Sequence, residues 1–374
     1  MQLNNLLLVS FGEIATYALY VVLAVFILLL HITVHETGHY LSGKILGFKI
    51  DEFAVGFGPR LFCKKRRSGE IFSFRLIPLG GFCAFRGEEN DCDDKGAFNR
   101  MHPFKRIIVL CSGAFFNFVF SLLIILLSFG IYGQNALFIG EITASEKYSV
   151  ENSLISGDTI LTANGKNVYL TTDLILALDG KVKDEVVSFC VIRGGEEQTV
   201  AVQLRADANF KNMEDAKKLY DCLGVVYQTD GEQITRVQLY ATNVRLGFFR
   251  TIGAGFEYSF KLAGTVFGVL GELLTGRIGI SSMGGTITTV TMTANAIAVG
   301  GLRYLMYIAS FIGVNLAVFN LLPIPALDGS KVIFCLIEWI RGKPINRKVE
   351  TVIHFIGLIL IVGFAILVDL QRCF

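Results

Sequence analysis

Three histidines and one glutamate lie close together in one strongly apolar stretch of the sequence, FILLLHITVHETGHYLSGKI, residues 26–45. Three of them, His35, Glu36 and His39, form an HExxH motif, and residues four apart on a helix share one face. The two imidazoles can therefore bind one metal ion while Glu36 takes a proton from a metal-bound water. The motif predicts a zinc hydrolase, because zinc lowers the pKa of bound water to about 7.

A zinc hydrolase needs a third protein ligand and an open coordination position. His31, the fourth group, lies one turn before His35, but three ligands in a row along one helix, about 6 Å apart, cannot converge on a tetrahedral ion. We therefore expect His31 to form a polar wall of the cavity. Asp328 is the better candidate, because a carboxylate in an apolar stretch finds compensation in a cation. It could also serve as a helix N-cap.

The sequence around Asp328, VFNLLPIPALDGSKV, breaks an apolar segment at residues 318–332. Pro323 and Pro325 remove backbone donors and interrupt the helix. Unwound backbone at membrane depth is tolerated only where it lines a cavity. Ionisable groups near the centre of a span cost about 2.5–3.5 kcal/mol each, so they need a functional reason. We expect both motifs to face one cavity inside the membrane.

The elements that must position these residues are membrane-spanning helices. Of the 374 residues, 52% are hydrophobic, which is too apolar for an ordinary soluble domain. Crossing about 30 Å of hydrocarbon takes about 20 helical residues. Four segments are long and apolar enough: 14–40, 106–132, 303–322 (continuing as a broken helix to 340) and 350–370.

The charges of the connecting segments predict the orientation. Residues 44–106 contain thirteen Lys and Arg and eight acidic residues, and residues 341–348 contain four Lys and Arg and no acidic residue. Residues 134–234 contain nine Lys and Arg and sixteen acidic residues. Because short basic loops stay cytoplasmic, we expect the first two segments inside the cell membrane and the acidic segment and both termini outside. The net charge of +2 gives no indication of nucleic acid binding.

Two connecting segments are expected to contain β-structure. Residues 51–103 predict a small membrane-associated antiparallel sheet on the cytoplasmic side, with turn signals at 56–59, 68–70 and 79–81. This sheet must sit against helices or line a wet cavity, because lipid does not tolerate open sheet edges.

The second such segment is a soluble α+β module with strands in DTILTAN, EVVSFCVIR and QTVAVQL and a short helix over 171–179. Its SLISGDTILTANGKNV stretch, residues 153–168, resembles a PDZ domain, a fold that adds an extended chain end to a sheet edge. The eight cysteines are scattered without a CxxC pair, so we expect unpaired thiols, although Cys190 and Cys222 could pair within this module.

The segment that follows has helical periodicity with glycine and charge throughout, and we expect amphipathic helices at the outer interface. A hidden fifth span is the alternative, and it would reverse the orientation of everything after it. The expected organisation is therefore 1–50 for the first span with HExxH, 51–103 for the sheet, 104–133 for the second span, 134–235 for the PDZ-like module, 236–300 for the amphipathic helices, and 301–374 for the broken third span and the fourth.

HExxH in the first span, NLLPIPALDG in the third and a PDZ-like insert between the second and third together resemble the site-2 protease family, in its bacterial sigma-regulating branch. The resemblance covers nearly the whole chain. It implies a polytopic α-helical membrane protein that binds zinc through His35, His39 and Asp328 and uses Glu36 as its catalytic base.

The resemblance also implies contacts to the substrate. Asn320 matches an asparagine that contacts the substrate backbone, and Pro323 and Pro325 should hold the chain beside it extended. The GxxxN pattern of the second span runs from Gly113 to Asn117, and by the resemblance Asn117 is expected to contact the substrate. The GFG turn, whose glycines are Gly56 and Gly58, should present a sheet edge to an unwound substrate. One departure is SMGGT at 282–286, where many relatives have SGPVG.

We therefore expect an intramembrane zinc endopeptidase that cuts single-pass membrane proteins, such as pre-trimmed anti-sigma factors or signal peptide remnants, from the cytoplasmic side of the bacterial cell membrane. By the same resemblance, the outer module should exclude substrates whose external domain is still present. The alternative is a non-enzymatic membrane metal transporter or sensor with the same ligands. Glu36 discriminates between them, because transport needs no general base.

Overall fold

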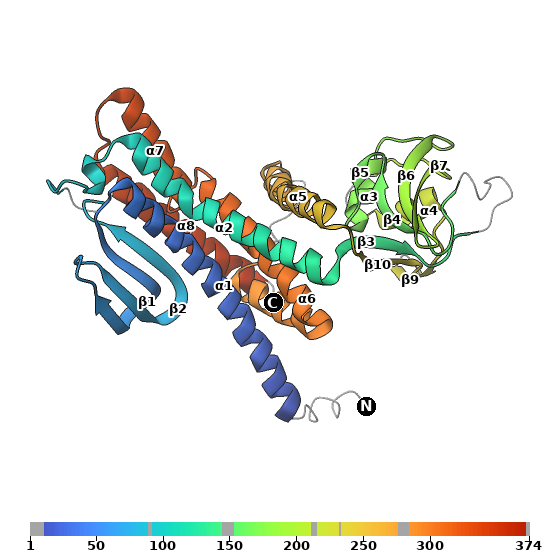
Figure 1. Ribbon diagram of the computed structural model, residues 1–374, viewed down its shortest axis with the longest axis horizontal. Helices are drawn as coiled ribbons and strands as arrows, with labels where there is room; N and C mark the ends of the chain where they lie inside the picture. The colour runs from blue at the N-terminus through green and yellow to red at the C-terminus, as the bar shows by residue number, and fades with distance from the viewer. Residues whose placement is uncertain are drawn as a thin grey trace. The chain divides into compact units, whose positions relative to one another are not determined.

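The computed structural model describes residues 11–88, 92–143, 153–210, 215–231, 233–275 and 284–371. The chain forms two compact units (Figure 1). The first contains residues 1–127 and 255–374, and the second contains residues 128–254. Residues 282 and 283 of the SMGGT stretch lie outside the described part of the chain.

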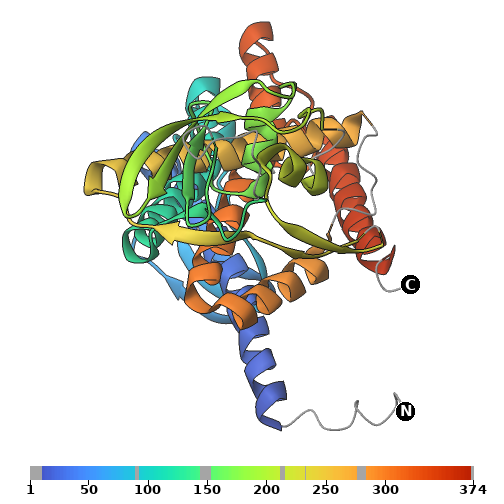
Figure 2. The same cartoon turned by 90° about the vertical axis from the view of Figure 1, so that its right-hand side faces the viewer.

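Four helices among the described residues are long and apolar enough to cross a membrane, which confirms the number of spans predicted. They are α1 (Phe11–Leu46), α2 (Pro103–Tyr132), α6 (Thr286–Leu321) and α8 (Arg347–Gln371). α6 packs against both α1 and α8 (Figures 1 and 2), and α2 approaches α1 closely at Gly38 and Gly113. α6 begins well before the predicted residue 303, and it is two helices joined at Gly301, whose φ of 59° interrupts the helical backbone.

Three further helical elements belong wholly or partly to the first unit. They are the 3-10 turn η2 (Phe98–Arg100), α5 (Phe248–Leu274) and α7 (Asp328–Arg341). α5 is not among the helices apolar enough to span. The predicted break between α6 and α7 is confirmed: α6 ends at Leu321 and α7 begins at Asp328, so the two prolines fall between them.

A long β-hairpin, β1 (Ile50–Lys65) and β2 (Ile71–Phe85), packs against α1 in the first unit. Turns were expected at 56–59 and 79–81, and the chain does reverse its direction at both segments, although both lie within the printed bounds of β1 and β2. Gly56, Gly58 and Gly80 have positive φ at these reversals. Residues 52–55 register with both 71–74 and 81–84, because each strand folds back on itself at its bend.

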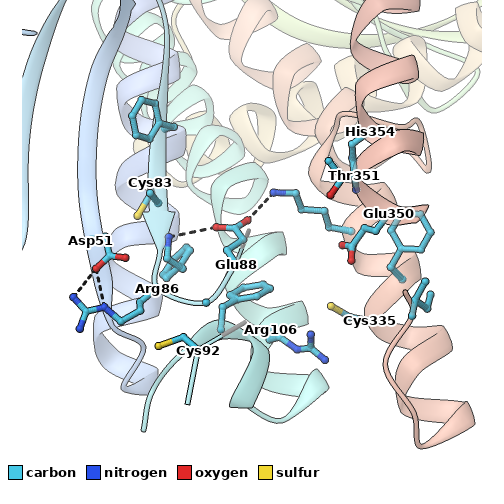
Figure 3. Close-up of a pocket in the computed structure, with 18 of the residues that line it drawn as sticks. Asp51, Cys83, Arg86, Glu88, Cys92, Arg106, Cys335, Glu350, Thr351 and His354 are labelled. Atoms are coloured by element: carbon cyan, nitrogen blue, oxygen red, sulfur yellow. Dashed lines mark hydrogen bonds and ion pairs between the residues drawn. The ribbon is translucent and has the colours of Figure 1, made fainter. Parts of the chain in front are cut away.

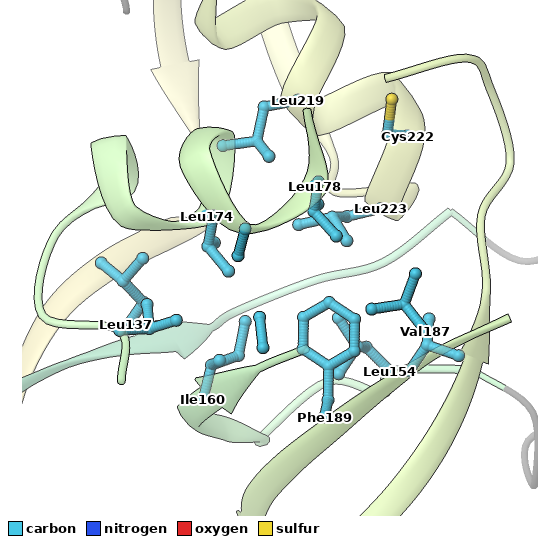
Figure 4. Close-up of a cluster of buried hydrophobic side chains, with 14 of the residues drawn as sticks. Leu137, Leu154, Ile160, Leu174, Leu178, Val187, Phe189, Leu219, Cys222 and Leu223 are labelled. Carbon is cyan, nitrogen blue, oxygen red and sulfur yellow. The ribbon is translucent and has the colours of Figure 1, made fainter. Parts of the chain in front are cut away.

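The second unit is built on a six-stranded sheet of order β10-β3-β4-β6-β7, with β5 paired to β4. Its strands are β3 (Gln134–Ile139), β4 (Thr159–Ala163), β5 (Lys166–Asn167), β6 (Val186–Arg193), β7 (Glu196–Gln203) and β10 (Leu239–Val244). α3 (Thr171–Leu178) and α4 (Ala216–Leu223) pack Leu174, Leu178 and Leu219 onto one face of this sheet (Figure 4). Cys190 and Cys222 are free thiols.

A separate hairpin, β8 (Tyr227–Asp230) and β9 (Gln233–Val237), completes the second unit. Residues 236–244 were expected to begin the amphipathic helices, but they end β9 and form β10. The physical reason is long-range pairing: β10 aligns antiparallel with β3, from Leu239 opposite Ile139 to Val244 opposite Gln134. The sequence pattern of so short a strand gives no signal of a partner a hundred residues away.

Candidate metal centre and substrate cavity

The structure brings together His35 and His39 on α1 and Asp328 at the start of α7. Asp328 Oδ2 lies 2.9 Å from His35 Nε2 and 3.2 Å from His39 Nε2, and the two imidazole nitrogens are 3.0 Å apart. The spacing of HExxH places both rings on one face of α1, and the break after α6 brings the carboxylate to them. Among the described residues, this is the one group of three His, Cys, Asp or Glu side chains whose ligand atoms are close enough to hold a metal ion.

The chemistry of this donor set fits a metal ion. His39 Nδ1 donates to the Val109 carbonyl at 2.8 Å, so a neutral His39 presents a lone pair at Nε2. That lone pair faces a second imidazole nitrogen and a carboxylate oxygen, and a cation satisfies all three. A tetrahedral zinc ion with bonds of about 2.0–2.1 Å would separate its ligand atoms by about 3.3 Å, close to the separations observed.

Gly113 on α2 gives the two imidazoles the space they occupy. A Cβ at this position would lie 2.5 Å from His39 Nε2 and 2.6 Å from His35 Cε1, so any side chain would displace the rings. The GxxxN pattern of the second span therefore has a steric reason at its first residue. Its last residue, Asn117, lies one turn further along α2 and reaches the cavity described next.

A cavity of about 390 Å³ opens beside the three ligand atoms. Glu36 lines it, and its Cγ packs close to Gly81 of β2, 3.3 Å from where a Cβ would sit. Asn117 and Asn320, from α2 and the end of α6, line the cavity as well. The remaining lining residues that the sequence did not single out are Ile32, Phe57, Gly80, Gly81, Leu316, Ala326 and Leu327.

Asn117 is fully buried, and neither its Oδ1 nor its Nδ2 has a hydrogen-bond partner. A buried polar group without a partner costs about 1–3 kcal/mol. Because the amide lines the cavity and neither its oxygen nor its nitrogen has a partner, it can form hydrogen bonds with a ligand that enters the cavity. The side chain offers one acceptor and one donor group, the two functions that a peptide unit complements.

The glycines of the GFG segment do not themselves line the cavity, whereas Phe57 between them does. Gly56 has a φ of +89° and backs onto β2, where a Cβ would lie 2.7 Å from the Ile77 carbonyl oxygen. Phe57 covers Gly80, leaving no room for a side chain there. The edge facing the cavity is thus formed by Phe57, Gly80 and Gly81, and the LGG sequence was the signal that could have indicated it.

Three other residues considered from the sequence lie away from the cavity. Pro323 and Pro325 are not among its lining residues, and Pro325 packs against Gly357 of α8 instead. His31 was expected to form a cavity wall, but it does not line the cavity. Its Nδ1 donates to the Ile27 carbonyl at 2.9 Å and its ring faces Gly313, because α6 packs against α1 at that level.

A buried carboxylate stabilises the bend in β1 that presents Phe57. Glu52 accepts hydrogen bonds from Arg60 at 2.6 Å, Ser73 at 2.5 Å and Arg75 at 2.8 Å. The same Arg75 guanidinium donates to the Gly58 carbonyl at 2.9 Å. Glu52 and Arg75 therefore fasten both ends of the bend to β2.

Replacing Glu52 by glutamine should destabilise the protein in a pH-dependent way. Burial by itself would raise the pKa of the Glu52 carboxyl, but the hydrogen bonds from Arg60, Ser73 and Arg75 lower it to about 2. The stabilisation is then complete above the ordinary pKa of 4.5 and is lost as the pH falls towards 2. We expect a loss of about 1.5–3 kcal/mol at neutral pH, the range for one hydrogen bond to a charged group.

The measurement is the unfolding midpoint of the wild type and Glu52→Gln in detergent, compared between about pH 7 and about pH 3. The gap between the two proteins should narrow as the pH falls. A gap that stays constant would show that the charge of Glu52 does not hold the bend.

Four candidate spans and an HExxH pair completed by a carboxylate from a broken helix define a multi-pass membrane protein with a metallopeptidase-type site. The profile of Peptidase family M50 matches residues 23–364. The chain belongs to this family. Peptidases of the family use zinc, so the metal predicted from HExxH is confirmed at the level of the family.

Several curated relatives resemble the chain over nearly its full length, and each carries the name "Putative zinc metalloprotease". One from Clostridium perfringens is 30% identical over 94% of this chain and 98% of its own length. One from Nostoc is 30% identical over 92% of this chain and 93% of its own. One from Fusobacterium nucleatum is 27% identical over 93% of this chain and 97% of its own length.

Proposed function

We propose that this protein is a site-2 type zinc endopeptidase that cleaves single-pass membrane proteins within or near their span. The observation that carries the proposal is that the three candidate ligands and Glu36 meet at a cavity bordered by α1, α2 and α6, three of the helices able to cross a membrane. The comparisons give no support to the alternative of a metal transporter or sensor.

In this proposal His35, His39 and Asp328 hold zinc. Bound zinc lowers the pKa of a water to about 7 and polarises the carbonyl to be attacked. Glu36 follows directly after His35 on α1 and lines the same cavity, so its carboxylate accepts the proton of the attacking water. The same carboxyl then donates a proton to the leaving amine, as a general acid.

The cavity is suited to an extended substrate rather than to a helix. An amide within a helix is shielded by its own hydrogen bonds, so the substrate must first unwind. Phe57 and the two glycines of β2 face the cavity from one side, while Asn117 and Asn320 face it from the helices. A strand held between them can form hydrogen bonds along both edges. Helix-breaking residues in the substrate should therefore favour cleavage.

Asn117→Leu should lower cleavage about tenfold to a hundredfold, because the substrate loses one or two hydrogen bonds in a buried site. The same change should leave the stability unchanged or raise it, since it removes an unpaired buried amide. Activity on a membrane substrate and the unfolding midpoint are the two measurements.

Ser121→Ala is the matched control. Ser121 lies one turn further along α2, is equally buried and has no hydrogen-bond partner, but does not line the cavity. Its replacement should raise the stability without lowering cleavage. Equal cleavage by Asn117→Leu and the wild type would remove Asn117 from the substrate site.

For the second unit we propose a PDZ-like role, with the module on the outer side of the bacterial cell membrane and both termini there. The support is its acidic composition beside basic loops elsewhere in the chain, and a sheet edge that could accept a peptide strand. On this proposal the module excludes substrates that have not been trimmed outside the membrane.

The deciding experiment reconstitutes the purified protein with a single-pass substrate in lipid vesicles and maps the cut by mass spectrometry. A cut within or next to the span, nearer the side that bears the basic loops, supports the proposal. Cuts confined to exposed loops of water-soluble proteins would contradict it.

A further inference from the structure

We propose that His354 and Gly357 on α8 are positioning residues that hold the loop carrying Asp328, and so set the affinity of the protein for zinc. The inference rests on the metal site of the proposed function. The sequence shows no motif around either residue, and the first lies 26 residues beyond Asp328.

The loop between α6 and α7 contains a strained residue. Ala326 has a φ of +79°, and the other non-glycine residues with positive φ in the described chain are an asparagine and an aspartate. Those two types tolerate the left-handed region, whereas alanine is strained there because its Cβ crowds the following carbonyl oxygen. Ala326 lies two residues before Asp328 and lines the catalytic cavity. A strained conformation persists only where the surroundings enforce it.

Two contacts from one face of α8 enforce it. The Ala326 N–H donates to His354 Nδ1 at 3.1 Å, which requires Nδ1 to be unprotonated. One turn later, Gly357 lets the Pro325 backbone lie directly on the helix, since a Cβ there would be 2.6 Å from the Pro325 carbonyl oxygen. Residues three apart on a helix share a face, so the two contacts act on the same peptide unit, the one that joins Pro325 to Ala326.

Packing alone does not hold the loop, because Ala326 has space on both sides. It lines the catalytic cavity, and it also lines a second cavity of about 1120 Å³ bordered by β2, α7 and α8. Figure 3 shows this second cavity, with His354 on α8 at its wall. Without its hydrogen bond to His354, the Ala326 peptide would have room to turn into either cavity and leave the left-handed conformation.

The first turn of α7, by contrast, also has contacts of its own outside α8. Gly329 packs against the end of α6, where a Cβ would lie 2.3 Å from the Leu322 carbonyl oxygen. Lys331 forms an ion pair with Glu88 at 2.7 Å. Losing the α8 contacts should therefore loosen the approach of the Asp328 carboxylate without unfolding α7. Such a supporting contact to a metal ligand is typically worth about 10–100-fold in affinity.

The test is the zinc dissociation constant of the purified full-length protein in detergent, measured by competition with a chromogenic chelator. His354→Phe keeps a ring beside Phe334, whose centroid lies 5.6 Å away, but removes the acceptor. Zinc binding should weaken about 10–100-fold. His354→Asn places an amide oxygen near the position of Nδ1, so its affinity should stay within about threefold of the wild type.

A second pair of variants separates positioning from folding. Ala326→Gly removes the cost of the left-handed conformation, so adding it to His354→Phe should restore the unfolding midpoint of the zinc-free protein. Zinc affinity should stay weak, because the loop is still not held. Wild-type affinity in His354→Phe, or equal weakening in His354→Asn and His354→Phe, would overturn the inference. If Asp328→Ala also binds zinc normally, the proposed metal site itself fails.

Discussion

Replacing Glu36 by glutamine should lower proteolysis about 10²–10⁴-fold, the usual contribution of a general acid–base residue. Glutamine has nearly the same shape as glutamate but cannot accept the proton of the attacking water. Because Glu36 lies beside the three ligand atoms without being one of them, the zinc content should not change. Cleavage of a reconstituted single-pass substrate and metal analysis of the same preparation measure the two quantities.

Glu36→Asp is the companion variant for this experiment. It keeps a carboxylate but shortens the side chain by one methylene, so its activity should lie between the wild type and Glu36→Gln. Undiminished cleavage by Glu36→Gln would assign the proton transfer to another group. A function that survives in every Glu36 variant would favour the metal transporter or sensor over the peptidase.

Asp328→Ala should abolish tight zinc binding and, with it, proteolysis. The wild type should hold about one zinc per chain, because the described residues form one three-ligand group. Alanine leaves two imidazoles on one helix, short of the three protein ligands that a catalytic zinc site uses. The affinity should fall by more than the roughly 10–100-fold expected for a supporting residue. Metal analysis after dialysis against a weak chelator gives the result directly.

Asp369→Asn is the control for a lost aspartate. Its carboxylate accepts hydrogen bonds from the Ile287 and Thr288 N–H groups at the start of α6, far along the chain from the metal ligands. This variant should lose some stability and keep its zinc. Normal zinc content in Asp328→Ala would place the third ligand elsewhere, and His31 is a poor substitute because its ring faces Gly313.

Local sequence patterns predicted the parts of this site that depend on local spacing. HExxH needs only helical periodicity to put His35 and His39 on one face, and the two prolines suffice to end α6 before Asp328. The four spans followed from hydropathy alone.

The features that sequence reasoning missed arise from contacts between distant segments. Phe57 covers Gly80, and β10 pairs with β3 about a hundred residues earlier. His354 accepts a hydrogen bond from the backbone of Ala326, and no motif around the histidine records that contact. Asn117 was named from a resemblance, but its burial without a partner can be seen only once the helices are packed.

The close approach of Gly113 to both imidazoles also bears on which metal ions the site will accept. α2 occupies the space behind the rings so fully that a Cβ would lie within 2.7 Å of the Nε2 atoms of both His35 and His39. Additional ligands can therefore reach a bound ion only from the cavity side. Ions that require six or more ligands, such as magnesium and calcium, would have to take all their remaining ligands from that one side, which disfavours them. An ion that needs only four ligands, three from the protein and one water, would fit. If His35, His39 and Asp328 hold a metal as proposed, the backbone of α2 would thus favour an ion of low coordination number.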